Sequence, residues 1–595
     1  MLRLPYAIIL LLILSAMAVQ TMAAPLPDLL APGEWIFSSP HPGDAFLDVV
    51  NEAGAPGGGE VQRLTVTAPS SPLWLIQFDR SIPANVPEGD LLKMHFWARS
   101  TTLNPVRVTL EQSAAPFQAV TEAMLTLTAD WREFTIQGLS PGLGPNALSA
   151  HFQGGESTGT MEITGVTVVD LGIDPSLAGA KKAIQPDQVQ ARIEKYRKGD
   201  LTVRVVDAYG KPMKNVSVEV SQTKHAFLFG CNIFGLTPSD QSATQIAYQN
   251  EFAALFNYAT LPFYWGAFES QEGKPDYARL QAMADWCVAH GISPKGHPLV
   301  WHQVWPYWAP NIPDDAIPLL KARVSDLIPR YKDTIHYWDV LNEANGAGGT
   351  TPPNGESAWI VRDGPASVVG TALGWARAAG SGLDDTFIYN DYETGQSNVN
   401  LLMALQTKGQ LPDAIGIQSH MHGGVWPLTK VWETCETFGK FGKPLHFTET
   451  TVLSGPTRNV DDSKPYPTDW YTTPDDEAKQ ADYAAQFYSL LFSHPSVRAI
   501  TWWDFSDLNA WRNAPSGLVR KDMTPKPAYT RLMDLIHHQW WTKAQGITNR
   551  SGSYSLRAFY GDYAITVTDS KGRSKTVSAA FPESAPPLSI TVSLP

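Results

Sequence analysis

Cysteine is scarce in this chain. Only three cysteines, Cys231, Cys287 and Cys435, occur among 595 residues, and no two of them are spaced as a Cys-x-x-Cys pair. This composition excludes a small disulfide-stapled fold and a zinc site built on cysteine pairs. At most one disulfide can form, so we expect burial of apolar side chains to hold the fold together.

Long hydrophobic runs are absent after the first residues of the chain. Residues 1–23 carry one positive charge at Arg3, an apolar stretch at residues 7–18 and small residues near position 23, which is the pattern of a signal peptide. No later segment reaches the roughly 18 apolar residues of a bilayer span. We therefore expect an exported protein, secreted, periplasmic or at the cell surface, with no membrane span after signal removal.

Dense basic stretches are also missing. The chain has 45 Lys and Arg against 58 Asp and Glu, a net charge of −13. This charge disfavours nucleic acid and anionic membranes as partners, whereas a neutral polymer is compatible with it. We expect a monomer.

The N-terminal part of the chain, residues 25–172, alternates apolar and polar positions between Gly, Pro and Asn turns, as in residues 73–78 and 92–97. This pattern predicts an all-β sandwich. In pattern and length it resembles the jelly-roll carbohydrate-binding modules, so a sugar-binding role and a purely structural role both stay open. Residues 173–195, with Pro175, Gly179 and Pro186, predict a linker.

Two further β-like segments flank the centre of the chain. Residues 196–225 and 546–595 each contain short alternating runs, such as residues 201–207 and 563–567. Neither segment has enough strands to bury a face by itself. Together they resemble a small transthyretin-like sandwich, and we expect the central domain to be inserted into it.

The central residues, 226–545, alternate short apolar runs with stretches of helical spacing. Eight runs are candidate strands, at residues 228–232, 258–263, 294–301, 335–343, 387–391, 414–420, 444–449 and 499–504. Eight β/α units predict an α/β fold of the (β/α)8 TIM-barrel type. The active site of such a barrel lies at the C-terminal ends of its strands.

Two glutamates, Glu343 and Glu449, end the fourth and seventh of these runs. Cleavage of a glycosidic bond needs a carboxylic acid to protonate the leaving oxygen and a carboxylate to meet the oxocarbenium-like carbon. Strand ends of a barrel hold such a pair at a fixed separation. The pair therefore indicates glycoside-cleaving chemistry.

Several motifs follow one another in a fixed order around this pair. They are Gly-His-Pro-Leu-Val-Trp-His at 296–302, Trp-Asp-Val-Leu-Asn-Glu-Ala at 338–344, Asn-Asp-Tyr at 390–392, Gly-Ile-Gln-Ser-His at 416–420, Phe-Thr-Glu at 447–449, Ala-Trp-Arg at 510–512 and Pro-Lys-Pro-Ala-Tyr at 525–529. In these motifs residues 226–535 resemble glycoside hydrolase family 10, the endo-β-1,4-xylanase family.

The resemblance implies roles for several residues of this region. Glu343 would be the general acid/base and Glu449 the nucleophile of a retaining double displacement, which requires Glu343 to have a raised pKa. Asn342 would contact the sugar 2-hydroxyl, and His420 would orient the nucleophile. The other substrate-binding residues implied are His297, Trp301, Asn390, Tyr392, Gln418, Trp503 and Trp511, and Tyr264 is a further expected contact at a position that departs from the family.

No cofactor is implied, and the spacing of His297, His302, His420 and His422 does not indicate a metal site. Neighbours on a strand face opposite sides, so Trp502 should lie in the core if Trp503 faces the sugar. The resemblance makes a polysaccharide, xylan or a related β-glycan, the expected substrate. Another β-glycanase, a β-glycosidase and a non-catalytic glycan-binding protein remain alternatives.

The second candidate strand departs from the family pattern. Family 10 xylanases carry a Glu-Asn pair and a Lys-Trp pair there, whereas this chain has Thr260-Leu261 and Tyr264-Trp265. The change removes groups that hydrogen-bond sugar hydroxyls. We hypothesise that the aromatic run of residues 263–265 stacks instead on a differently decorated or less hydrated glycan.

Overall fold

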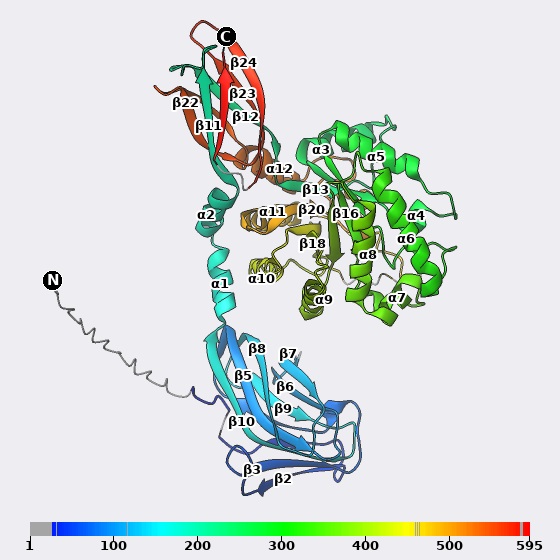
Figure 1. The fold of residues 1–595 in the computed structure, drawn as a ribbon. Coiled ribbons are helices and arrows are strands. Elements are labelled where there is room, and N and C mark those ends of the chain that lie inside the picture. Colours follow the sequence, from blue (N-terminus) through cyan, green and yellow to red (C-terminus); the bar gives the residue numbers. More distant parts are fainter. Residues whose placement is uncertain are drawn as a thin grey trace, which may run out of the picture. The chain divides into compact units, whose positions relative to one another are not determined.

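The computed structural model describes residues 26–30, 32–115, 117–458, 460, 462, 464–583 and 587–594. The predicted signal peptide, residues 1–23, lies outside the described residues. The chain divides into two compact units, Met1–Ala178 and Gly179–Pro595, and each is described by itself (Figure 1).

The N-terminal unit is the expected all-β sandwich, built from two five-stranded antiparallel sheets. One sheet has the order β1 (Ile36–Ser38), β4 (Gln77–Ile82), β9 (Leu148–Gln153), β6 (Val106–Gln112) and β7 (Ala119–Leu125). The other has the order β2 (Ala45–Asn51), β3 (Glu60–Val66), β10 (Gly159–Ile173), β5 (Val86–Ser100) and β8 (Arg132–Leu143). The rings of Phe78 and Phe96 pack on Phe152 at 5.1 and 5.2 Å between the sheets.

The prediction of a strand over residues 73–78 was wrong for the first part of this segment. Leu73–Leu75 form a 3₁₀ turn, and β4 begins only at Gln77. Leu73, Ile76 and Phe78 are buried, and the spacing of three residues between Leu73 and Ile76 fits one 3₁₀ turn. Over so few residues the apolar pattern did not distinguish the turn from a strand.

The predicted linker is helical. α1 (Pro175–Ala183) and α2 (Pro186–Tyr196) occupy most of residues 173–195. Pro175 and Pro186 are the first residues of these helices, a position where the missing N–H costs no hydrogen bond and the fixed φ is already helical. Proline therefore marks helix starts here.

The two segments that flank the central domain form one small sandwich, as expected. Its sheets are β22 (Ser553–Phe559), β11 (Lys198–Val206) and β25 (Leu588–Ser593), and β21 (Lys543–Ile547), β12 (Ser217–His225), β23 (Gly561–Thr568) and β24 (Ser574–Phe581). β11 lies between two strands from the other end of the chain, antiparallel to β22 and parallel to β25. The barrel is thus an insertion between β12 and β21.

The centre of the chain is a closed barrel of eight parallel strands, as the sequence predicts. The strands are β13 (Leu228–Asn232), β14 (Tyr258–Pro262), β15 (Ser293–His297), β16 (Tyr337–Asn342), β17 (Thr386–Asp391), β18 (Ala414–His420), β19 (Leu445–Thr451) and β20 (Val497–Trp502). β20 pairs with β13 and closes the ring. β15 and β16 are shorter than the apolar runs that predicted them.

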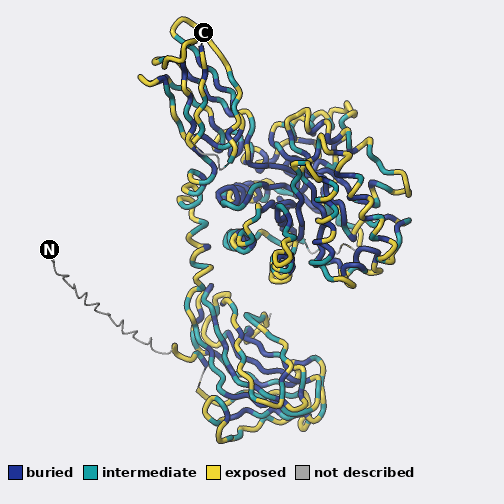
Figure 2. Tube along the Cα trace, viewed as in Figure 1, coloured by how far each residue is buried: buried dark blue, intermediate teal, exposed yellow. Residues whose placement is uncertain are grey.

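Helices surround the barrel. They are α3 (Ala243–Leu255), α4 (Trp265–Phe268), α5 (Tyr277–Ala289), α6 (Pro313–Arg330), α7 (Gly355–Asp363), α8 (Pro365–Ala379), α9 (Gln396–Thr407), α10 (Leu428–Gly439), α11 (Pro474–Ser493) and α12 (Pro527–Asp534). Both faces of the strands are covered, so the strands read as continuous apolar runs. Figure 2 shows the strands buried and the exposed residues on the outer faces of the helices.

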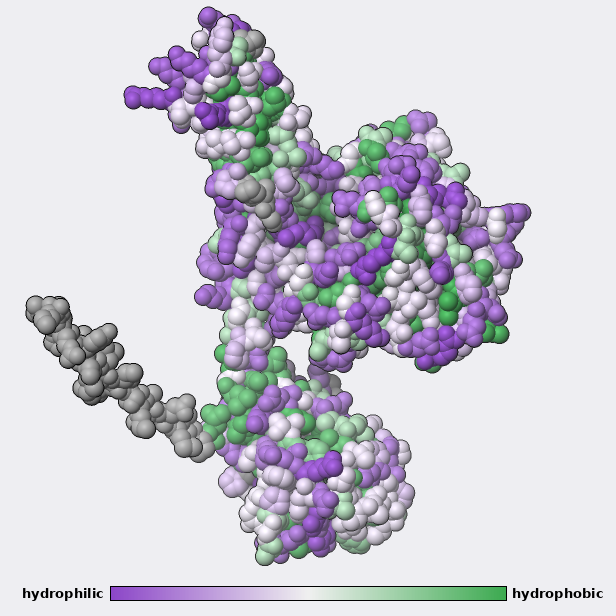
Figure 3. Space-filling model, in the orientation of Figure 1, coloured by the Kyte–Doolittle hydropathy of each residue, from purple (hydrophilic) through white to green (hydrophobic). Residues whose placement is uncertain are grey.

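The surface and the state of the cysteines are consistent with a fold that is stabilised by the burial of apolar side chains. Figure 3 shows hydrophilic residues interspersed with small clusters of hydrophobic residues over the visible face of the barrel. The three cysteines are buried and unpaired. Within the described part of the chain, no helix combines the length and the hydrophobicity that a membrane span requires.

Candidate active site

A cavity of about 1080 Å³ opens at the C-terminal ends of the barrel strands. Eleven of the twelve predicted site residues line it, and the exception is Asn390. The eleven are Tyr264, His297, Trp301, Asn342, Glu343, Tyr392, Gln418, His420, Glu449, Trp503 and Trp511. The closure of the barrel brings together side chains from seven of its eight strands or the loops that follow them.

Glu343 comes directly after β16 and has a left-handed backbone, with φ of +60°. Such a conformation is uncommon for a residue other than glycine and occurs often at functional sites. The carboxylate accepts hydrogen bonds from Trp301 Nε1 at 3.1 Å and Gln418 Nε2 at 2.8 Å. Burial, and then the charge of Glu449, raise the pKa of Glu343 to about 7, although both hydrogen bonds act in the opposite direction.

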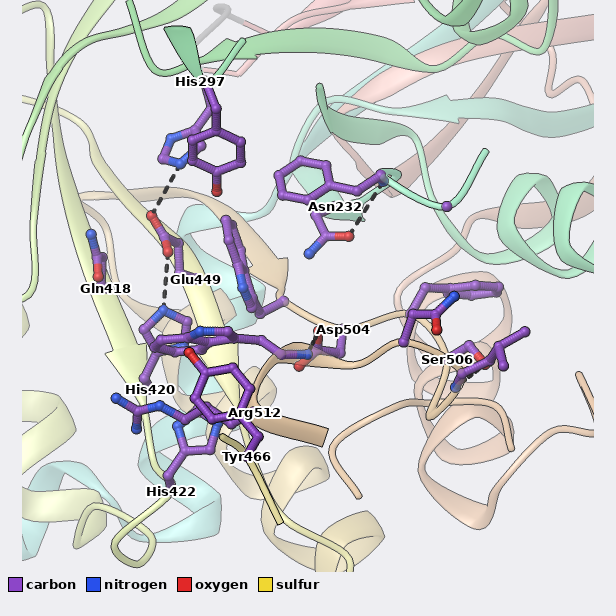
Figure 4. A pocket seen from close by; sticks show the side chains of 18 of the residues that line it. Asn232, His297, Gln418, His420, His422, Glu449, Tyr466, Asp504, Ser506 and Arg512 are labelled. Atoms are coloured by element: carbon purple, nitrogen blue, oxygen red, sulfur yellow. Dashed lines mark hydrogen bonds and ion pairs between the residues drawn. The ribbon is translucent and has the colours of Figure 1, made fainter. Parts of the chain in front are cut away.

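Glu449 lies on β19 and is held at both oxygens. Asn390 Nδ2 donates to Oε1 at 2.7 Å, and His420 Nε2 donates to Oε2 at 3.0 Å. Burial acts to raise the pKa of Glu449, but the His420 hydrogen bond and the charges of His297, His420 and Lys295 outweigh it, so the pKa lies below its ordinary value. Figure 4 shows Glu449 between His297 and His420.

A buried charge network supports the nucleophile side of the cavity. Asp339 Oδ2 accepts hydrogen bonds from Lys295 Nζ at 2.6 Å and His297 Nδ1 at 2.7 Å. His297 Nε2 lies 3.9 Å from Glu449 Oε1. Only His297 was predicted, yet Lys295 is two residues earlier on β15 and therefore shares its face. The partner Asp339, on the next strand, lies in the motif at residues 338–344, but no role was predicted for it.

Asn390 lies beneath the cavity and is fully buried. Its Nδ2 donates both to Glu449 and to Asn342 Oδ1, the latter at 2.8 Å, and its Oδ1 accepts from Thr448 Oγ1. The residue therefore positions two others, whereas the sequence placed it among the sugar contacts. Because the oxygen of Asn342 is occupied, its amino group remains to donate to a ligand.

Aromatic rings form the walls of the cavity. Trp511 packs on His420 at 4.7 Å, and Trp503 contacts His420 and His297, each at 5.6 Å. Tyr264 lies 5.3 Å from Trp301. Trp502 is fully buried and donates to Ser516 O, as strand alternation predicts.

The aromatic run at residues 263–265 does not act as a unit. Phe263 packs on Trp338 at 5.3 Å and Trp265 on Trp305 at 5.0 Å, both in the core. Only Tyr264 reaches the cavity. The hypothesis that all three rings stack on a glycan was therefore wrong for two of them.

Several lining residues were not predicted. Asn232 ends β13, and the C-terminal position on its strand could have identified it. Asp504 accepts hydrogen bonds from Trp511 N at 2.9 Å and Ser516 Oγ at 2.7 Å, and burial raises its pKa to about 6. Among the described residues, no group of three or more His, Cys, Asp or Glu side chains is arranged to hold a metal ion.

The arrangement offers two carboxyl groups in different protonation states to one cavity. Near neutral pH a large fraction of Glu343 is protonated, whereas Glu449 is charged. Glu343 can give a proton to the leaving oxygen of a glycosidic bond, and Glu449 can attack or stabilise the carbon from which that oxygen departs.

Comparison with known proteins places this barrel in a family. The model of the family described as "Glycosyl hydrolase family 10" matches residues 222–535. The chain is 27% identical over 390 residues to anti-sigma-I factor RsgI6 of Acetivibrio thermocellus, over 64% of this chain and 46% of that protein. It is 24% identical over 293 residues to endo-1,4-beta-xylanase B of Thermotoga neapolitana, over 46% of this chain and 78% of that protein.

A solved structure, xylanase 10B from Thermotoga petrophila RKU-1 in complex with xylobiose, has 22% sequence identity and a TM-score of 0.44. Its match covers 53% of this chain and 95% of that chain. The chain spans less than half the length of the Acetivibrio relative. The family match itself covers more than half of the 595 residues, and the chain therefore belongs to glycosyl hydrolase family 10.

Proposed function

We propose that the protein is a retaining endo-β-1,4-xylanase that cleaves xylan or decorated xylan. The observation that carries the proposal is the unequal protonation of Glu343 and Glu449 in one cavity, with pKa values moved in opposite directions. Xylan is the preferred substrate because the Thermotoga relative is named as a xylanase.

In the first step the proton of Glu343 passes to the glycosidic oxygen while Glu449 attacks the anomeric carbon. The bond to the leaving sugar breaks, and a covalent glycosyl ester forms on Glu449. His420 and Asn390 hold the attacking carboxylate, and the free amino group of Asn342 is available to the sugar 2-hydroxyl.

In the second step a water molecule replaces the leaving sugar. Because esterified Glu449 has lost its negative charge, the pKa of Glu343 falls, and its carboxylate takes a proton from the water. The resulting hydroxide attacks the anomeric carbon and releases Glu449. Two inversions retain the β configuration.

The location and assembly of the protein belong to the same proposal. The signal-peptide pattern of residues 1–23 supports export, and an extracellular or periplasmic enzyme meets its polymer without transport. The proposal includes a monomer, because the residues proposed for catalysis in this chain already form a complete site that needs no residue of a second subunit.

The test compares wild type, Glu343→Ala and Glu449→Ala on xylan, arabinoxylan, mixed-linkage β-glucan and mannan. Products are sized by mass spectrometry, and their anomers are followed by proton NMR. Wild type should release β-configured oligosaccharides from xylan, and Glu449→Ala should release none. An α-configured first product, or unchanged turnover by Glu449→Ala, would contradict the mechanism.

A second candidate is a glycan-binding protein that does not turn over its ligand. The loss of the polar groups at Thr260, Leu261 and Tyr264 favours it, and so does the Acetivibrio relative, which is named as an anti-sigma factor. Calorimetric binding of xylohexaose without product formation would support this candidate. Release of xylose alone would instead indicate a β-glycosidase.

A further inference from the structure

One side of the cavity, here called the β13 lobe, lies at the ends of β13, β14 and β20. Its lining includes Asn232, Phe234, Tyr248, Tyr264, Trp503 and Phe505. Figure 4 shows Asn232, Asp504 and Ser506 on one side of the cavity, apart from His422, Tyr466 and Arg512. The departure of the second strand from the family pattern falls on this lobe, at Tyr264.

The wall of the β13 lobe is aromatic. The ring of Phe234 meets Tyr264 at 5.6 Å and Trp503 at 5.5 Å, edge to face in both contacts. Tyr264 and Trp503 in turn contact His297, at 5.5 and 5.6 Å, and His297 is the neighbour of Glu449. The apolar wall therefore begins at the proposed nucleophile.

Most polar side chains of the lobe are already bonded within the protein. Gln245 donates to Gly235 O at 2.8 Å and accepts from Thr237 N at 3.1 Å. Asp504 uses one oxygen for Trp511 N and the other for Ser516 Oγ.

Ser506 completes this set, since it donates to Arg520 O at 3.1 Å and accepts from Leu508 N at 3.0 Å. Thr244 and Asn509 are exposed at the rim. These polar groups are poorly placed to replace the water around the hydroxyls of a bare sugar ring.

Asn232 offers one donor at the bottom of the lobe. Its Oδ1 faces Phe234 N at 3.5 Å, which leaves the amino group to donate, and the Tyr264 hydroxyl is a second donor from the same wall. Donors beside apolar rings suit a ligand that accepts a hydrogen bond and is otherwise apolar.

We propose that the β13 lobe binds an ester-linked acyl group on the glycan, so that the enzyme prefers O-acylated xylan. Esterification replaces a hydroxyl donor by a carbonyl acceptor, which Asn232 or Tyr264 can bond. The methyl or ring of the acyl group packs against Phe234 and Trp503. This inference rests on the proposed xylanase function.

The experiment measures kcat/KM on soluble O-acetylated xylo-oligosaccharides and on the same material after alkaline removal of the esters. A second pair, feruloylated arabinoxylo-oligosaccharides before and after the same treatment, distinguishes a small acyl group from an aromatic one. Wild type should prefer at least one esterified substrate by about fourfold or more, the factor for removing roughly one methyl group from water.

The preference is the ratio of kcat/KM on the esterified substrate to kcat/KM on the same substrate without esters. Phe234→Asn should bring this ratio close to one, whereas Tyr466→Asn, on the other side of the cavity, should keep the wild-type ratio. The ratio is taken on one preparation and is independent of the folded fraction. If Phe234→Asn does not fold, Phe234→Leu replaces it and should lower the preference for the aromatic acyl group.

Three results would overturn the inference. Equal or slower cleavage of both esterified substrates would refute it and leave the proposed xylanase function intact. A preference that survives Phe234→Asn or its replacement would place the acyl group elsewhere. Failure to cleave any of the four substrates would defeat both the inference and the proposed function.

Discussion

The pKa of Glu343 is the property on which the proposed mechanism most depends, and Glu449→Gln tests its origin. The substitution removes one negative charge and keeps the shape of the side chain, but it leaves one acceptor oxygen for the two donors Asn390 and His420. Burial and the Glu449 charge both raise the pKa of Glu343 to about 7. Without that charge, the pKa should fall.

The size of the fall follows from Coulomb's law. Carboxyl groups of retaining glycosidases lie about 5–5.5 Å apart, and with an effective dielectric constant of about 20 their repulsion is about 3 kcal/mol. That energy corresponds to a change of about 2 in pKa. Since burial is the larger cause and persists in the variant, the pKa should fall by about 1 to 2 and stay above 4.5.

Substitutions that remove a hydrogen bond to Glu343 should change its pKa in the opposite direction. Gln418 and Trp301 donate to its carboxylate and lower its pKa. Gln418→Met or Trp301→Phe removes one charge-assisted hydrogen bond, worth about 1.5–3 kcal/mol, and should raise the pKa by about 1 or more.

Carbon-13 NMR of glutamate side-chain carboxyls, titrated against pH, measures these values directly. The resonance of Glu343 is identified by its loss in Glu343→Gln. Asp569→Asn, in the small sandwich, serves as a control that should leave the pKa unchanged. If Glu449→Gln leaves the pKa near 7, or if Gln418→Met lowers it, the electrostatic reasoning about the pair is refuted.

Three further predictions concern pH and stability. Because Glu343 must be protonated in the first step and its pKa is about 7, kcat/KM on xylan should fall about tenfold per pH unit well above pH 7; a flat profile to pH 9 would contradict this. Arg197 is 2% exposed and donates to the carbonyls of Phe492, His494 and Val497. Arg197→Met should therefore lower the free energy of unfolding by about 3 kcal/mol in urea titrations, and a loss under about 1 kcal/mol would count against these bonds. A Cβ on Gly296 would lie 2.2 Å from Trp338 Cζ3, so Gly296→Ala should cost about 1–3 kcal/mol. An unchanged Tm in calorimetry would show that Trp338 can move aside.

Many local features were predictable because neighbouring residues encode them. The eight strands appear as apolar runs between helical stretches, and their order already implies a barrel with Glu343 and Glu449 at strand ends. Alternation at the end of β20 separated Trp502, in the core, from Trp503, in the cavity wall. The two-part small sandwich followed because neither flanking segment could bury a face alone.

Short or ambiguous patterns were less informative. Residues 73–78 read as a strand because Leu73 and Leu75, and again Ile76 and Phe78, are two residues apart, as on one face of a strand, although Leu73–Leu75 form a 3₁₀ turn. Pro175 and Pro186 helped to predict a linker, but their pattern did not show that the linker is helical, because proline at the first position of a helix breaks no hydrogen bond. Both cases arise because one local pattern is compatible with two backbone conformations.

By itself, the sequence determined the barrel, the split sandwich and the identity of the two catalytic candidates. The tertiary structure decided what surrounds them. It placed Asn390 beneath the cavity, paired Lys295 with Asp339 of another strand, and buried Phe263 and Trp265 while leaving Tyr264 in the wall. These outcomes depend on which strands become neighbours when the barrel closes and on how deeply each side chain is then buried. The same closure sets the pKa of Glu343, since burial and a charge more than a hundred residues away combine to raise it.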